Sequence, residues 1–422
     1  MHTESALAAA RSQAVADEST ANHVGRPMER LEDAALLTGR GSYADDLGVK
    51  PGTLHAALLR SPHAHARLIR IDAQAALRLP GVRAVLTGED VQRWSQPFVV
   101  GLKFADGHAM HHWALAVDRV RYVGEPIAVV IAEDRYLAED ALDSIRVEYE
   151  PLPAVVTIEQ ALDAAYPPLH EALGANLASD RQFRYGDPET AFEQAAHRVA
   201  LTVQYPRNSC TPIECGVVIA EHLAGDEGYD VTSNFMGPFS LHAVMALALK
   251  VPGNKLRHRL PRDSGGSFGV KQAVFPYVVL MSLASRKAGA PVKWVEDRLE
   301  HLSAATSANA RRTTIEAAVD VDGRITALRY DQVDEVGGYL RAPEPATTYR
   351  MHGCLTGAYD IVNLAVRNRV VVTNKTPTGL VRGFGGPQVY YALERLMDRI
   401  AVELKIDAVE LRRLNYVRSA QF

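Results

Sequence analysis

DSGGSFGVKQ, residues 263–272, is the stretch on which the interpretation of this chain depends, and a second glycine cluster, RGFGGPQ, follows at 382–388. Glycine-rich loops bind phosphates when their spacing is right. A phosphate-binding loop needs G-x-x-x-x-G-K-[ST], but the fifth residue after Gly265 is Val270. The dinucleotide pattern G-x-G-x-x-G also fails, and in the second cluster Gln388 takes the place of the last glycine. The spacing therefore argues against nucleotide binding.

The first cluster also contains G-x-S-x-G, with Ser267 at its centre, which is the pattern around the nucleophile of many hydrolases. That serine follows a strand directly, and its histidine base comes late in the chain. Pro261 would break the preceding strand, and the last histidine, His352, lies well before the end of the sequence. A serine hydrolase using Ser267 is therefore an alternative that only the pentapeptide favours.

A third interpretation makes both clusters backbone cradles for a ligand. Glycine has no Cβ and adopts positive φ easily, so its N–H groups can approach an electron-rich group closely. Each cluster also carries a phenylalanine, Phe268 or Phe384, and precedes a predicted helix. Helix N-termini favour anions. The alternative is that both clusters are only tight turns between packed elements, and the residues alone leave both possibilities open.

The segments around the clusters predict an α+β fold. Residues 127–134, IAVVIAED, have the length and composition of a buried strand. Residues 313–331 alternate in polarity around Asp322-Gly323, which is typical of a hairpin. Residues 389–404 repeat apolar side chains at helical spacing. Strand and helix signals therefore mix along the whole chain.

The domain boundary is expected near residue 155. EYEPLPAV (148–155) places two prolines directly after a predicted strand. We therefore predict one domain over 25–155 and a second over 156–422. Residues 1–24 show no comparable pattern and are expected to form a flexible tail.

Composition and charge exclude several classes of protein. The 422 residues carry a net charge of −4, which gives no basic surface for nucleic acid. Cys210, Cys215 and Cys354 match neither a disulfide framework nor a four-ligand zinc site, and we predict no metal ligand in the chain. The sequence contains neither an apolar run of membrane-spanning length nor a secretory signal. We expect a cytoplasmic protein without membrane contact.

Five motifs, in a fixed order, resemble those of one protein family. They are RSPHAHAR (60–67), YVGEPIAVVIAED (122–134), DSGGSFGVK (263–271), PVKWVEDRLEHL (291–302) and RGFGGPQ (382–388). Together they resemble the molybdenum-binding large subunit of the xanthine dehydrogenase, aldehyde oxidase and carbon monoxide dehydrogenase family. The resemblance implies an α+β hammerhead domain over 25–155, followed over 156–422 by the first part of the molybdopterin-binding domain.

The resemblance also implies a reaction and its cofactors. Members of the family hydroxylate a carbon atom with oxygen from water at a molybdopterin cofactor, and we expect the molybdopterin cytosine dinucleotide here. Electrons then pass to [2Fe-2S] clusters and FAD, which we expect on an iron–sulfur subunit and a flavoprotein subunit. The protein mainly positions such cofactors. A planar heteroaromatic compound, an aldehyde or an aromatic acyl thioester is the expected substrate.

Positions that match the family's motifs suggest the residues of the first cofactor-contacting loop. Phe268 and Gly269 are expected to place backbone amides near the molybdenum end of the cofactor. Gly266 and Ser267 are expected to contact the cofactor and to permit this close approach, because glycine has no side chain and that of serine is small. The resemblance thus favours the cradle interpretation over the hydrolase.

The resemblance assigns the second loop and the substrate in the same way. Arg382 and Gly383 are expected at the cofactor, and Phe384 is expected to stack on a planar substrate. Arg350 falls where the xanthine enzymes hold an arginine that orients the substrate. A guanidinium there would hydrogen-bond a carbonyl or carboxylate and stabilise developing negative charge.

Three positions depart from the family's pattern. Met236 stands where a glutamine commonly hydrogen-bonds an oxo ligand, and a thioether is a poor substitute. Gln272 replaces the glutamate of the xanthine enzymes, which argues against a purine substrate. Gly383 takes the place of the copper-binding cysteine of carbon monoxide dehydrogenases. Met236 and Gln272 are nonetheless expected at the cofactor.

The resemblance implies that the sequence ends about half way through the usual large subunit. The other half would carry the glutamate general base, so we predict no base in this chain and no activity for the isolated chain. We favour a large subunit split over two polypeptides, because the sequence ends after a complete, capped helix. A truncated product, or a non-catalytic scaffold that keeps the fold, is the alternative.

Overall fold

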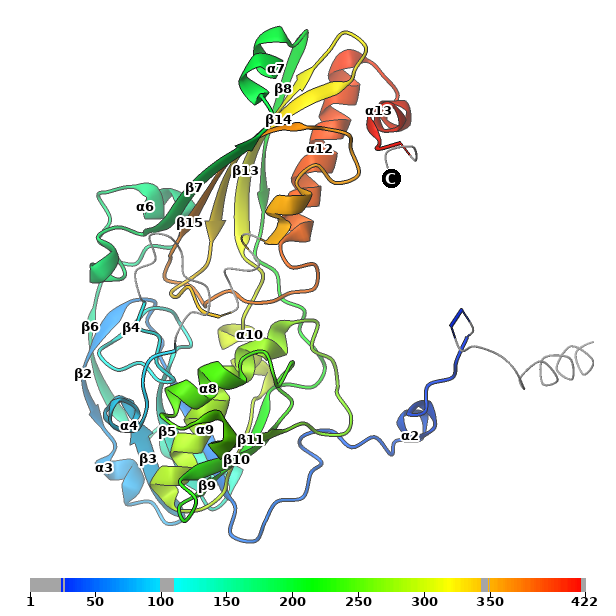
Figure 1. The fold of residues 1–422 in the computed structure, drawn as a ribbon. Helices are drawn as coiled ribbons and strands as arrows, with labels where there is room; N and C mark the ends of the chain where they lie inside the picture. Colours follow the sequence, from blue (N-terminus) through cyan, green and yellow to red (C-terminus); the bar gives the residue numbers. More distant parts are fainter. Residues whose placement is uncertain (1–23, 26, 99–109, 343–347, 349, 419–422) are drawn as a thin grey trace, which may run out of the picture. The chain divides into compact units, whose positions relative to one another are not determined.

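Figure 1 shows the computed structural model, which describes residues 24–25, 27–98, 110–342, 348 and 350–418. The chain forms two compact units, residues 1–42 and residues 43–422. In the first unit the structure describes the short helix α2 (Asp33–Leu37). The tail predicted over residues 1–24 lies almost entirely outside the described residues. The elements named below belong to the second unit.

Three β-sheets organise the second unit. The seven-stranded sheet has the order β11 (Leu256–Arg259), β10 (Gly228–Ser233), β9 (Val217–Leu223), β12 (Val292–Val295), β1 (Leu54–Arg60), β5 (Pro126–Ala132) and β3 (Val82–Thr87). The five-stranded sheet has the order β7 (Leu177–Tyr185), β15 (Asn363–Val371), β14 (Ile325–Glu335), β13 (Ala310–Val319) and β8 (His197–Tyr205). The three-stranded sheet has the order β4 (Arg119–Val120), β2 (Ala66–Asp72) and β6 (Arg146–Pro151).

Helices connect these strands and cover the sheets. The α-helices are α3 (Gln74–Leu77), α4 (Gly88–Trp94), α5 (Arg135–Leu142), α6 (Ile158–Leu162), α7 (Pro188–Gln194), α8 (His242–Ala248), α9 (Phe275–Ala288), α10 (Arg298–Ala304), α12 (Gly386–Leu404) and α13 (Ala408–Asn415). The 3-10 helices are η2 (Glu171–Leu173), η3 (Gly253–Lys255), η4 (Val270–Val274) and η5 (Arg350–Cys354). Among the described residues, no helix has the length and apolar character needed to cross a membrane. The predicted α+β class is confirmed.

β5 is buried at every position because its neighbours enclose it on all sides. It pairs with β1 on one edge and with β3 on the other. Val129 and Ile131 share a hydrophobic core with α9, whereas Ala128 and Val130 share another with α5. A strand covered on both faces has a continuous apolar sequence instead of an alternating one, which confirms the prediction of a buried strand at 127–134.

The seven-stranded sheet draws strands from both sides of residue 155. β1 pairs in parallel with β12, through Leu54 with Val292 and His55 with Lys293. β12 in turn pairs antiparallel with β9. Strands that precede the expected domain boundary therefore share one hydrogen-bonded layer with strands that follow it.

The five-stranded sheet is covered by α12, which lies along it in Figure 1. One side of α12, including Leu393, Leu396 and Ile400, packs in a core with Val199 of β8 and Ile315 of β13. The hairpin of β13 and β14 turns at Gly323, whose φ of +86° suits glycine. The predicted helix at 389–404 and the predicted hairpin are both confirmed.

Glu125 connects the start of β5 to the segment after β14, and its burial makes stability depend on pH. Its carboxylate accepts hydrogen bonds from the backbone N–H of Arg121 at 2.5 Å and from the Tyr339 hydroxyl at 2.8 Å. Burial raises the pKa of Glu125 from 4.5 to about 7, although these hydrogen bonds oppose the rise. The folded state therefore holds this proton more tightly than the unfolded state does.

We expect Glu125→Gln to remove a pH dependence of stability between pH 4.5 and 7. Below pH 4.5 the carboxyl group is protonated in both states of the wild type, and its stabilising contribution is complete. As the pH rises through about 7 that contribution is lost, on the order of 3 kcal/mol. Urea unfolding at pH 5 and pH 8 measures the change. The exposed variant Glu139→Gln is the control, and parallel profiles for Glu125→Gln and the wild type would contradict the prediction.

Candidate functional site

The two glycine clusters lie against each other, although more than 100 residues separate them in the sequence. The backbone N–H of Arg382 donates a hydrogen bond to the Phe268 carbonyl at 2.8 Å. A Cβ atom added to Gly269 would lie only 2.6 Å from the carbonyl oxygen of Leu380. The Arg382 guanidinium also lies over the Phe268 ring, 5.0 Å from its centroid. The loops therefore form one joined structure.

Each loop holds its phenylalanine in a backbone conformation that is costly for that residue. The φ angles of Phe268 and Phe384 are +52° and +54°. Non-glycine residues rarely adopt positive φ, and such strain persists only where the surrounding structure enforces it, often at functional sites. Phe268 keeps 42% of its surface exposed, and Phe384 is half-buried. Both aromatic rings thus lie at the surface formed by the two loops.

Several backbone N–H groups of the loops are available to a ligand. Within the described part of the chain, those of Gly266, Ser267, Phe268 and Gly383 have no protein acceptor. Gly266 and Gly383 have φ angles of +97° and +103°. Successive free N–H groups in a glycine-rich turn form a concave site for an anionic or electron-rich group. The described residues therefore fit a molybdopterin cofactor at this surface.

Met236 and Gln272, which the sequence predicts at the cofactor, contact Ser267 and Ser240. The Met236 sulfur accepts a hydrogen bond from the Ser267 hydroxyl at 3.1 Å. The Gln272 amide donates to the Ser240 hydroxyl at 2.8 Å, while its Oε1 is buried without a hydrogen-bond partner in the described structure. An unpaired buried acceptor is costly, so Oε1 is suited to a donor that is not part of the described structure.

Among the described residues, Ser267 has no hydrogen bond to the base that a hydrolase nucleophile requires. Its hydroxyl donates to the Met236 sulfur and accepts a hydrogen bond from the Gly269 N–H at 3.3 Å. A nucleophilic serine needs an adjacent base such as an imidazole. The hydrogen bonds recorded for Ser267 therefore do not support the hydrolase alternative.

Arg350 is the predicted site residue that the structure leaves open. Its backbone begins η5, which runs to Cys354. Its side chain, however, lies outside the described part of the structure. A role for Arg350 in orienting the substrate stays a prediction.

A groove runs beside the second loop. It has a water-accessible volume of about 150 Å³. Its lining includes Arg382, Gly385 and Gln388 of the second loop, together with Cys210 and Asn309 from other segments. The Gln388 amide donates to the Asn309 carbonyl at 3.1 Å, which fixes that wall of the groove. The groove gives the joined loops a hollow in which a small molecule can bind.

Two family models match the chain. Residues 38–153 match the aldehyde oxidase and xanthine dehydrogenase a/b hammerhead domain, and residues 169–416 match the molybdopterin cofactor-binding domain. The chain belongs to the xanthine dehydrogenase and aldehyde oxidase family of molybdenum-binding large subunits. The hammerhead fold, followed by part of the molybdopterin-binding domain, is thereby confirmed.

Relatives within the family act on different compounds, as their names state. The chain is 36% identical to the 6-hydroxypseudooxynicotine dehydrogenase complex subunit gamma of Paenarthrobacter nicotinovorans, over 93% of this chain and 49% of that protein. It is 34% identical to the carbon monoxide dehydrogenase large chain of Hydrogenophaga pseudoflava, over 93% and 50%. The crystal structure of quinoline 2-oxidoreductase from Pseudomonas putida 86 matches with a TM-score of 0.90 and 35% identity, over 96% and 51%. The chain spans about half the length of these relatives.

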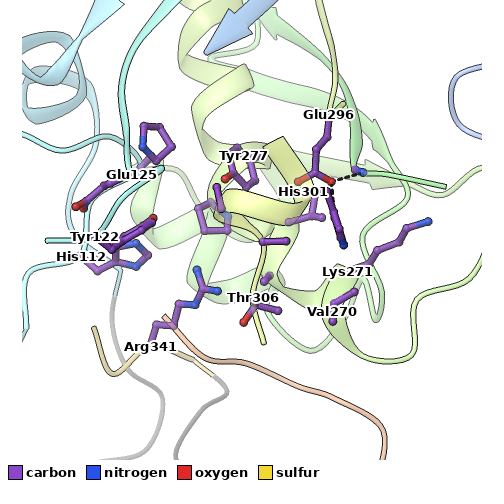
Figure 2. Close-up of a pocket in the computed structure, with 18 of the residues that line it drawn as sticks. His112, Tyr122, Glu125, Val270, Lys271, Tyr277, Glu296, His301, Thr306 and Arg341 are labelled. Atoms are coloured by element: carbon purple, nitrogen blue, oxygen red, sulfur yellow. Dashed lines mark hydrogen bonds and ion pairs between the residues drawn. The ribbon is translucent and has the colours of Figure 1, made fainter. Parts of the chain in front are cut away.

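Sequence reasoning missed a narrow cavity next to the first loop. Its water-accessible volume is about 40 Å³, enough for two or three water molecules. Figure 2 shows Val270 and Lys271, which follow Gly269 directly, lining it together with Tyr277 and Arg341. The residues come from motifs far apart in the sequence, so no local pattern indicates this cavity.

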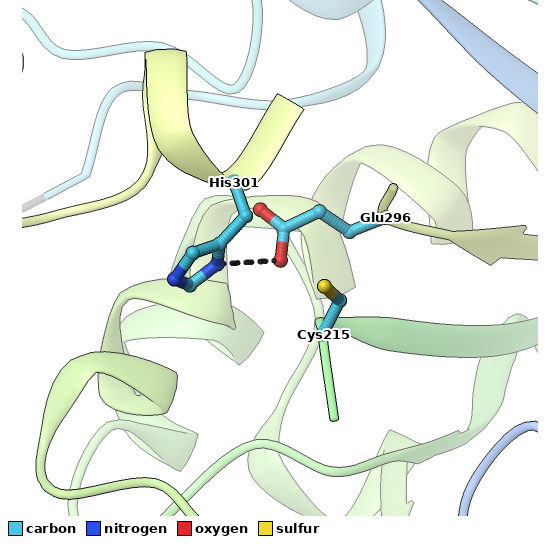
Figure 3. A group of neighbouring side chains, drawn as sticks. All are labelled: Cys215, Glu296 and His301. Atoms are coloured by element: carbon cyan, nitrogen blue, oxygen red, sulfur yellow. Dashed lines mark hydrogen bonds and ion pairs between the residues drawn. The ribbon is translucent and has the colours of Figure 1, made fainter. Parts of the chain in front are cut away.

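Cys215, Glu296 and His301 form a group of possible metal ligands that the sequence did not single out. Their ligand atoms lie within 4.8 Å of one another. Figure 3 shows the three side chains together. The Glu296 carboxylate accepts from His301 Nδ1 at 3.1 Å and from the Gly216 N–H at 2.8 Å. Burial raises the pKa of the Cys215 thiol, which favours the protonated thiol as long as no metal ion is bound. We therefore interpret the group as a buried carboxylate–imidazole pair beside a thiol.

Proposed function

We propose that this chain forms the first half of the molybdenum-binding subunit of a hydroxylase. It would hold a molybdopterin cofactor, as the cytosine dinucleotide, through the two glycine loops. The observation that carries this proposal is the hydrogen bond between Arg382 and Phe268, which joins two strained loops beside four free N–H groups. When bound, the cofactor supplies the redox chemistry that hydroxylates a carbon with oxygen from water. The [2Fe-2S] and FAD groups would lie on partner subunits.

A planar nitrogen heteroaromatic compound is the substrate that we place first. Phe384 is half-buried at the second loop, where its ring can stack on a planar compound. Relatives named for a nicotine derivative and for quinoline match this chain at 36% and 35% identity. Gly383 offers no thiol for copper, which argues against carbon monoxide. Arg350 would orient the substrate, and we assign the general base to the half of the subunit outside this sequence.

The surface around the first loop supports a second polypeptide as the partner. Ile213, Phe239 and Leu299 are 93%, 94% and 77% exposed. The Arg298 side chain, next to Leu299 in the sequence, donates to the Ile213 carbonyl at 2.8 Å, so the segments that carry Ile213 and Leu299 lie close together. Exposed apolar side chains that gather around a site mark an interaction surface. The second half of the large subunit would cover them and close the cofactor site.

Purification of the complex through this chain tests the proposal. We expect native mass spectrometry to find a second polypeptide, and metal and pterin analysis to find molybdopterin in about equal amount to this chain. Turnover of quinoline in ¹⁸O-labelled water should place the label in the product. Recovery of this chain only as a monomer without molybdenum would overturn the proposal and favour a non-catalytic scaffold that keeps the fold. Met236 supports that alternative, because its thioether replaces the amide expected at this position.

A further inference from the structure

Glu214 lies beside both ends of the first glycine loop and hydrogen-bonds to each. Its Oε2 atom accepts from the Gly265 N–H at 2.9 Å and from Lys271 Nζ at 2.5 Å. Its other carboxylate oxygen accepts from the Ala44 N–H at 3.2 Å. One oxygen atom therefore connects the residue before the strained turn to the residue after it.

The backbone of Glu214 adds a third connection to the same loop. Its N–H donates to the Gly265 carbonyl at 3.4 Å. These two segments of the chain approach so closely that a Cβ atom on Gly265 would lie 2.3 Å from the Cβ of Glu214. Only glycine fits at residue 265, because any side chain there would overlap Glu214.

The pair is more than a surface ion pair, because water is largely excluded from it. The side chains of Lys271 and Glu214 are 3% and 12% exposed. Burial alone would raise the pKa of Glu214, but the donors Lys271 and Gly265 hold it below its ordinary value. A buried charge that loses its partner is strongly destabilising, so the two charged groups remain together.

Between these two anchors the backbone follows a strained path. Gly266, Phe268 and Gly269 have φ angles of +97°, +52° and +107°. The three residues of the first loop whose N–H groups have no acceptor in the described structure, Gly266, Ser267 and Phe268, lie entirely within this segment. Strain of this kind persists only where the surroundings fix both ends of the segment. The contact of Phe268 with Arg382 fixes the middle, and Glu214 fixes the ends.

We propose that Glu214 and Lys271 are a positioning pair that sets the conformation of the cofactor cradle. Glu214 holds Gly265 and Lys271 at a fixed separation, so that the intervening N–H groups point together toward the ligand. The identity of that ligand, a molybdopterin, rests on the proposed function. The role of the pair in the geometry of the loop does not. Neither residue contacts the cofactor in this arrangement; both act through the backbone.

Glu214→Gln tests the proposal because it keeps the shape of the side chain and removes its charge. In the full chain we expect trypsin to cleave after Arg262, at the edge of the loop, at least about tenfold faster than in the wild type, because the loop opens more often. In the purified complex, molybdopterin content should fall by a similar factor. Lys287→Met, which breaks the pair with Asp90 elsewhere on the chain, is the matched control and should change neither quantity.

Other measurements separate positioning from general stability. Glu214→Asp keeps the charge but shortens the side chain, and it should also increase cleavage after Arg262 while the global unfolding midpoint stays near that of Lys287→Met. It takes the place of Glu214→Gln if that variant does not fold. Cleavage after Arg262 at the wild-type rate overturns the proposal. So does an increase in cleavage that is no larger than the loss of global stability accounts for. If even the wild-type complex lacks molybdopterin, the proposed function fails, and cleavage after Arg262 alone still decides the positioning role.

Discussion

Replacing Asp334 with alanine is expected to lower the free energy of unfolding by about 3–5 kcal/mol. Asp334 lies in β14, and its carboxylate accepts hydrogen bonds from Arg311 at 2.6 and 3.2 Å, from Asn309 at 2.5 Å and from Asn368 at 2.7 Å. The side chains of Asp334 and Arg311 are both 0% exposed. Truncation leaves a guanidinium buried without a counter-charge, and two amides lose their acceptor.

Asp180→Ala is the matched control for this prediction, measured by urea unfolding in the same buffer. Asp180 also accepts two hydrogen bonds from an arginine on a neighbouring strand, Arg367, at 3.1 and 2.6 Å. These side chains are 29% and 45% exposed, so water and salt screen the pair. We expect a loss of less than about 1 kcal/mol. Equal losses in the two variants would show that burial does not determine the energy of these pairs.

The parts of the fold that could be predicted are those whose signal is local. The apolar side chains of α12 recur every three or four residues, and the hairpin turn at Gly323 lies between its own two strands. The seven-stranded sheet could not be predicted in this way, because β1 pairs with β12 across more than 200 residues. Backbone pairing over such a distance leaves no periodic pattern in either strand.

The candidate site shows the same division. Glycine content marked both loops, since positive φ and close approach favour glycine at Gly266, Gly269 and Gly383. The expectation that both loops contact one cofactor followed only from the resemblance to a family. Glu214 went unnoticed because an isolated glutamate is usually a surface residue, and its role depends on Lys271, a partner 57 positions away.

Replacing Gly269 with alanine is expected to destabilise the chain by about 2–6 kcal/mol, from backbone strain and overpacking together. Gly269 has a φ of +107°, which residues with a side chain rarely adopt. The new methyl group would lie 2.6 Å from the Leu380 oxygen and 2.8 Å from its carbonyl carbon. Backbone atoms cannot move aside as a flexible side chain can, so the two loops must separate. The cradle formed by the loops would open, and the complex should lose its cofactor.

Gly289→Ala is a control in which only backbone strain is expected. Gly289 also has a positive φ, +66°, but an added Cβ would have no atom of the described residues within 4 Å. Alanine there should cost only the backbone strain, about 1–2 kcal/mol. Gly269, at φ +107° and ψ −34°, lies outside the left-handed helical region that Gly289 occupies at φ +66° and ψ +21°, so alanine is more strained at Gly269. Chemical denaturation of both variants should therefore show a larger loss for Gly269→Ala, from the added strain and the overpacking against Leu380 together. Equal losses would contradict the close contact of Gly269 with Leu380, and with it the joined cradle proposed to hold a cofactor.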